Sequence, residues 1–125
     1  MDLDRAQESL KAAELCLQEG LINSAANRAY YAIFQAAHVA MSAAGFPRKE
    51  WSHYGLQAGF TTELIHHKKL YPGIFRDYLS QGFGVRRAAD YGLAGVSKKI
   101  AQRLVHRATA FVTAVEERVR DEITS

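Results

Sequence analysis

The sequence predicts an all-α protein, an up-and-down bundle of four to five helices, and three observations favour this fold class. Apolar residues recur at intervals of three and four along most of the chain, no segment alternates as a strand does, and only two prolines interrupt 125 residues. The 48% hydrophobic and 23% charged content is that of a globular protein and excludes a disordered chain. We expect one domain covering residues 1–125.

Two helices are predicted in the first third of the chain. The first begins near Leu3 and ends at about residue 19, because Gly20 is a typical helix terminator. The second spans about residues 23–44, with Asn23 and Ser24 as expected N-caps and Pro47 beyond its end. A loop of roughly eight residues should follow it.

Two or three further helices are predicted after this loop. One should start near His53 or Tyr54, and the next opens at Ile74. Glycine costs about 1 kcal/mol relative to alanine inside a helix, so we expect a kink or break at Gly82 and Gly84. The last helix lies beyond residue 95 and has the longest apolar stripe, comprising Val96, Ile100, Leu104, Ala108, Phe111, Val115 and Val119.

Positive charge is concentrated in one part of the chain. Residues 66–107 carry nine Lys/Arg against two Asp/Glu, whereas residues 1–65 carry five against seven and residues 108–125 two against four. Such a basic segment with interleaved aromatic rings could bind a polyanion such as RNA, but the charge alone favours a solvated helix face. The interleaved rings are Tyr71, Phe75, Tyr78, Phe83 and Tyr91.

Several classes of protein are excluded or disfavoured. The chain has no membrane-spanning apolar stretch and no signal peptide, and its single cysteine, Cys16, cannot form an internal disulfide, so we expect a soluble, cytoplasmic protein. The five histidines have no H-E-x-x-H spacing, and neither a Walker loop nor a G-x-G-x-x-G motif is present. We therefore expect no metal and no cofactor.

Two polar clusters are candidate functional sites. The second predicted helix carries a polar stripe, and Arg28 and Tyr31 on it would hold a phosphate or nucleotide if the stripe faces a cleft rather than solvent or a dimer partner. The stripe comprises Arg28, Tyr31, Gln35, His38 and Ser42. In the second cluster, Arg86 and Asp90 are four residues apart and either pair along a helix or serve phosphate binding and acid–base chemistry, with Arg87 and Tyr91 beside them.

Three stretches together resemble the small stand-alone HEPN proteins of bacteria and archaea, over nearly the whole chain. They are Ser24–Phe34 with its N-R-x-Y-Y segment, His53-Tyr54-Gly55 leading to Phe60, and the R-x-x-x-D-Y segment from Arg86 to Tyr91. The last helix adds Ala108 and Phe111-Val112 to the pattern. The resemblance implies a helical bundle, commonly a homodimer, that is often encoded beside a minimal nucleotidyltransferase and classed as half of a toxin–antitoxin pair.

Many HEPN proteins are metal-independent ribonucleases with an R-x(4–6)-H motif contributed by both protomers. Here Arg86 matches the motif arginine, but Tyr91 stands where the histidine would be. Leu93 also replaces the tyrosine that some nucleotidyltransferase partners modify with adenylate. Phenols ionise near pH 10, so tyrosine is a poor base at neutral pH and the ribonuclease motif is degenerate.

Three hypotheses follow. In the first, the protein binds RNA, a nucleotide or a nucleotidyltransferase without cutting RNA, and the contacts come from Arg28, Tyr31, His53, Arg86 and Arg87. In the second, it is a metal-independent endoribonuclease toxin in which Arg86 holds the phosphate and the base is one of Asp90, Tyr91 and His53. In the third, it is a purely structural dimer in which Asp90 pairs with Arg28 or Arg86.

Overall fold

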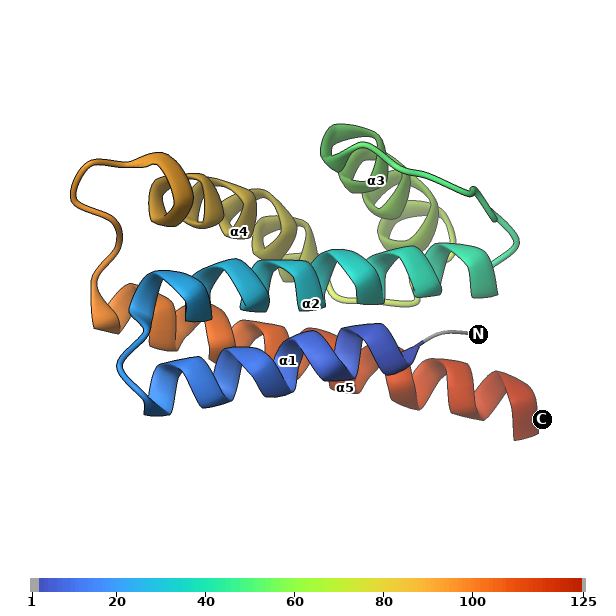
Figure 1. The fold of residues 1–125 in the computed structure, drawn as a ribbon. Helices are drawn as coiled ribbons and strands as arrows, with labels where there is room; N and C mark the ends of the chain where they lie inside the picture. Colours follow the sequence, from blue (N-terminus) through green and yellow to red (C-terminus); the bar gives the residue numbers. More distant parts are fainter. Residues whose placement is uncertain (1–2, 125) are drawn as a thin grey trace.

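The computed structural model describes residues 3–124, with side chains described as far as residue 121, and these residues form a helical bundle around a central helix (Figure 1). Along the chain the elements are α1 (Leu3–Gln18), α2 (Ile22–Ala43), α3 (His53–Gly59), the π-helical segment η1 (Phe60–His67), α4 (Ile74–Tyr91) and α5 (Lys98–Thr124). No strand occurs within residues 3–124. The predicted all-α bundle is confirmed.

The central helix is α2, which packs against α1, α3, α4 and α5. In Figure 1, α3 and α4 lie above α2, while α1 and α5 lie below it. The buried face of α2 consists mainly of alanines, whose small side chains let neighbouring helices approach closely. These alanines are Ala25, Ala26, Ala29, Ala32, Ala36, Ala37 and Ala40.

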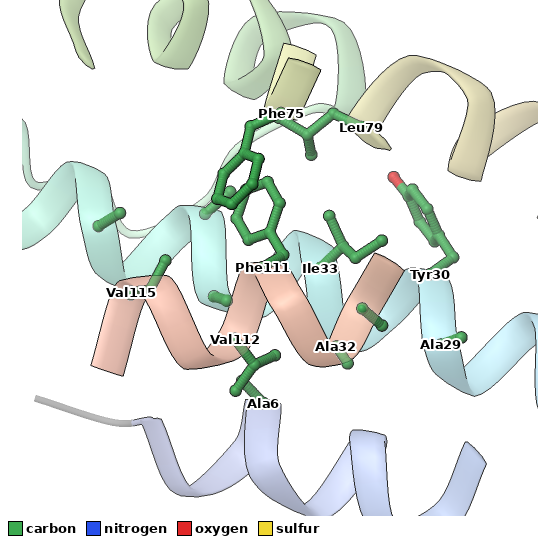
Figure 2. Close-up of a cluster of buried hydrophobic side chains, with 14 of the residues drawn as sticks. Ala6, Ala29, Tyr30, Ala32, Ile33, Phe75, Leu79, Phe111, Val112 and Val115 are labelled. Atoms are coloured by element: carbon green, nitrogen blue, oxygen red, sulfur yellow. The ribbon is translucent and has the colours of Figure 1, made fainter. Parts of the chain in front are cut away.

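Larger side chains from the other helices fill the core around this alanine face. The rings of Phe75 on α4 and Phe111 on α5 are stacked with their centroids 4.6 Å apart (Figure 2). Ile33 of α2 is fully buried, as are Leu79 of α4 and Val115 of α5. The segment after the loop buries Leu56, Phe60 and Leu64. No helix within the described residues is long and apolar enough to span a membrane.

The predicted caps of α2 are wrong. The helix begins at Ile22, and the residue that precedes it, Leu21, provides no side-chain cap. The Asn23 side chain has a different partner, because its Oδ1 accepts a hydrogen bond of 2.9 Å from the backbone N–H of Val96. Asn23 therefore fastens the loop between α4 and α5 to the start of α2.

The predicted break in α4 is also wrong, because the helix is continuous through both of its internal glycines. A Cβ atom on Gly82 would lie 3.4 Å from both Leu104 Cδ1 and Tyr30 Cδ1. This spacing leaves no room for a side chain larger than that of alanine, so Gly82 lies at a close contact of α4 with α2 and α5. Gly84 faces open space.

Candidate functional site: an arginine and aromatic face on α2, α3 and α4

Two arginines from different helices lie against the ring of Tyr31. The Cζ atom of Arg28, on α2, is 5.1 Å from the ring centroid, and that of Arg86, on α4, is 5.5 Å from it. Both distances are within the range of a cation–π interaction. The structure thus brings together the two arginines that the sequence leaves 58 positions apart.

A chain of polar contacts joins the same two arginines. Arg28 donates from Nε and Nη2 to Asn27 Oδ1, at 3.0 and 2.8 Å, and Asn27 Nδ2 donates to Asp90 Oδ2 at 2.9 Å. Asp90 Oδ2 lies 3.2 Å from Arg86 Nε, and the Arg86 and Asp90 side chains are only 19% and 24% exposed. The chain Arg28–Asn27–Asp90–Arg86 therefore ties α2 to α4. Sequence reasoning gave Asn27 no role here, although it belongs to the N-R-x-Y-Y segment.

His53 is held at the first position of α3. The preceding Ser52 caps the helix, since its Oγ accepts a hydrogen bond of 3.0 Å from the N–H of Gly55. The imidazole is stacked on Phe83 of α4, with ring centroids 3.9 Å apart and an interplanar angle of 12°. Its Nδ1 lies 2.8 Å from the hydroxyl of Tyr30, a residue that is 3% exposed. Core packing therefore fixes the position of His53.

Burial favours the neutral forms of both Tyr30 and His53. It raises the pKa of Tyr30 well above its usual range, against the opposing effect of the Arg86 charge. Burial also lowers the pKa of His53, and a hydrogen bond with the Gln57 side chain opposes that shift. Tyr30 is thus a phenol that can donate its proton to Nδ1 of a neutral imidazole at pH 7.

Three more side chains complete the same face. Arg87 Cζ lies 5.8 Å from the ring centroid of Phe83, and the 74% exposed Tyr91 has its ring 5.9 Å from Arg86 Cζ. Tyr54 is 69% exposed and makes T-shaped contacts with His53 and Phe83, at centroid distances of 5.2 and 5.6 Å. Tyr54 and Phe83 are not among the predicted site residues. The sequence places Tyr54 in the His53-Tyr54-Gly55 stretch and Phe83 among the aromatic rings of the basic segment. We call this face, made of Arg28, Tyr31, His53, Tyr54, Phe83, Arg86, Arg87 and Tyr91, the arginine–aromatic face.

A pocket of about 500 Å³ opens beside this face, and Arg28 and Asp90 lie in its wall. The other lining residues come from α1, α2 and α4: Ala12, Cys16, Asn23, Ser24, Asn27 and Ala89. Within residues 3–121, no group of three His, Cys, Asp or Glu side chains is placed to bind a metal ion.

Gln35 and His38, farther along the predicted polar stripe on α2, have structural partners instead. Gln35 shares a hydrogen bond of 2.8 Å with Ser9 Oγ on α1, and His38 Nε2 lies 2.9 Å from the backbone oxygen of Arg48. Only Arg28 and Tyr31 of the stripe belong to the arginine–aromatic face.

Comparison with known proteins identifies the family. The sequence model of the HEPN domain family matches residues 2–118, so the chain belongs to the HEPN family. It is 30% identical over 118 residues to a UPF0332 protein of Thermotoga maritima, and the aligned region covers 94% of this chain and 87% of that protein. It is 32% identical over 117 residues to a UPF0332 protein of Gloeobacter violaceus, with coverages of 92% and 90%. A Methanocaldococcus jannaschii protein named "Putative toxin" is 24% identical over 119 residues, with coverages of 95% and 87%.

Proposed function

We propose that this protein is the HEPN subunit of a toxin–antitoxin-like module and that it binds RNA through the arginine–aromatic face without cutting it. The observation that carries the proposal is the placement of Arg28 and Arg86, from two helices, around Tyr31. The names of distant relatives support the toxin–antitoxin context. We also propose that the protein forms a homodimer and has a nucleotidyltransferase partner, as is common in this family.

Phosphate is the ligand that best fits this geometry. Guanidinium groups donate in a fixed fork that matches phosphate oxygens, and aromatic rings beside them offer stacking surfaces for bases. Arg87, the residue after Arg86 on α4, adds a third cation, within the segment 66–107 that holds most of the positive charge. Asp90 is the carboxylate that offsets part of this charge through Arg86.

The partners of the candidate bases support the proposal that the protein does not cut RNA. Activation of a ribose 2′-hydroxyl needs a base within hydrogen-bond reach of it. Asp90 already accepts from Asn27 and pairs with Arg86, and His53 is held by Tyr30, Gln57 and the stacked ring of Phe83. Tyr91 is a phenol in the place of the motif histidine. None of these groups has the arrangement of a poised base.

A second candidate function rests on one observation about His53. Because burial lowers its pKa, the imidazole is in the neutral, basic form at pH 7, and it lies on the same face as Arg86. A metal-independent endoribonuclease would use Arg86 to bind the phosphate and His53 to move the proton. Release of the Tyr30 or Gln57 hydrogen bond would have to precede that step.

The deciding experiment incubates the purified protein with total RNA in EDTA, beside the Arg86→Ala variant. Arg76→Ala is the matched control, since Arg76 is an exposed arginine near the other end of α4. Binding is read by gel shift and cleavage by electrophoresis, with a thermal melt to verify folding. Intact RNA that the parent and Arg76→Ala bind, and Arg86→Ala binds weakly, supports the proposal.

The other outcomes separate the alternatives. RNA cut by the parent and left intact by Arg86→Ala would establish the ribonuclease, and His53→Gln would then test the base. If the parent neither binds nor cuts RNA and Arg86→Ala only lowers the Tm, the cluster is structural and ties α4 to α2.

A further inference from the structure

We infer that Tyr54, backed by the stacked pair His53 and Phe83, is a platform for an unpaired RNA base, so that the site selects single-stranded RNA. The inference rests on the proposed RNA binding and adds to it a residue and a class of substrate. It starts from a large aromatic ring that is 69% exposed and contacts Phe83, over which Arg87 lies.

The ring of Tyr54 is supported from behind but leaves most of its surface free. Its contacts with His53 and Phe83 are T-shaped, with interplanar angles of 76° and 68°, so they cover only part of the ring. The two supporting rings are locked together at 3.9 Å, and the buried hydroxyl of Tyr30 holds His53 in place. A base that stacks on Tyr54 therefore meets a surface that needs little reorganisation to bind it.

Cations and rings alternate along α4 next to this platform. Phe83, Arg87 and Tyr91 follow each other at intervals of four residues and so occupy one side of the helix, with Phe83 and Tyr91 about 12 Å apart along its axis. Arg87 lies over Phe83, and Arg86 lies over Tyr91. This alternation matches the bases and phosphates of consecutive nucleotides in a single strand.

A duplex would not satisfy the same surface. In double-stranded RNA the bases are stacked on each other and paired, and proteins contact mainly phosphates and 2′-hydroxyls. A protruding ring such as Tyr54 gains stacking only from a base with a free face. Isolated exposed aromatics are common on proteins, but this one contacts two other rings, and Arg87 lies over one of them.

The test measures affinities for three fluorescent ligands: a 12-nucleotide single-stranded RNA, the corresponding duplex, and an abasic strand with the same phosphates. Tyr54→Ala should bind the single strand roughly tenfold more weakly than the parent does, and Tyr54→Phe should bind it as the parent does. Affinities for the duplex and the abasic strand should not change in either variant. Ile74→Ala is the matched control, because it removes an apolar side chain that is 49% exposed on α4.

The two proposals fail in different ways. If Tyr54→Ala binds the single strand as tightly as the parent while Arg86→Ala weakens binding, the platform is wrong and the arginine site stands. If the parent binds none of the three ligands, both proposals fall. A 2-aminopurine base in the strand gives an independent readout, since stacking on Tyr54 quenches its fluorescence in the parent and Tyr54→Ala should abolish that quenching.

Discussion

Replacement of Asp90 by asparagine should strengthen RNA binding, because this carboxylate lies next to the arginine that we assign to phosphate. A phosphate on Arg86 would be roughly 6 Å from Asp90, where the repulsion between unit charges is about 0.7 kcal/mol in a medium as polar as water. Its removal corresponds to about threefold tighter binding. Asparagine retains an oxygen that can accept from Asn27, and loss of the ion pair should lower the free energy of unfolding by about 0.5 kcal/mol.

The assay is fluorescence anisotropy with a labelled single-stranded RNA in EDTA at several salt concentrations. Asp77→Asn removes the same charge from the first turn of α4, about 20 Å from Asp90 along the helix, where screening should abolish any effect. The gain for Asp90→Asn should shrink as salt rises. Weaker RNA binding by Asp90→Asn with an unchanged Tm would refute the reasoning, because it would mean that Asp90 contacts the RNA directly.

Three further predictions concern packing and protonation. Gly82→Val should lower the free energy of unfolding by about 1–3 kcal/mol, because the methyl groups of valine would overlap Leu104 and Tyr30. Gly84 faces open space, so Gly84→Ala should raise the free energy of unfolding by about 0.5–1 kcal/mol. Equal effects of the two substitutions in urea denaturation would contradict this. Tyr30→Phe should cost about 0.5–1.5 kcal/mol through loss of the hydrogen bond to His53, and an unchanged urea midpoint would disprove it. Because the pKa of His53 is lowered in the folded state, the stability from its neutral form is complete above the unfolded-state value of about 6.5 and is lost as pH falls below it. His53→Gln should therefore show a smaller drop in Tm between pH 7.5 and 5 than the parent, and identical drops would contradict the assignment.

The helices could be predicted from the sequence because their apolar stripes are regular. The end of α1 just before Gly20, whose φ is +77°, and the apolar stripe of α5 from Leu104 to Val119 follow from local patterns alone. The two errors have a common cause in tertiary contacts. Asn23 bonds to the loop before α5 instead of capping α2, and Gly82 serves the close approach of α4 to its neighbours. Local helix propensity does not reveal the tertiary contacts of either residue.

Part of the candidate site could be predicted from the sequence, because one of its contacts lies within a single helix. The pair Arg86 and Asp90 follows from a spacing of four residues on one helix, and the structure places the two side chains 3.2 Å apart. The meeting of Arg28 with Arg86 over Tyr31 depends on how α4 packs against α2, which no spacing encodes. The sequence identifies Phe83 only as one of several aromatic residues in a basic segment. Its contact with His53 of α3, like the meeting of the two arginines, joins residues far apart in the sequence.

Tyr30 links these observations, since it belongs to both the core and the site. It is 3% exposed, it lies against Gly82, and its hydroxyl contacts His53. Phe83, the residue after Gly82 on α4, stacks on His53, and Arg86 and Arg87 follow one turn later on the same helix. A side chain larger than that of alanine at Gly82 would displace Tyr30. We therefore expect such a substitution to disturb the arginine–aromatic face and weaken RNA binding as well as lower stability.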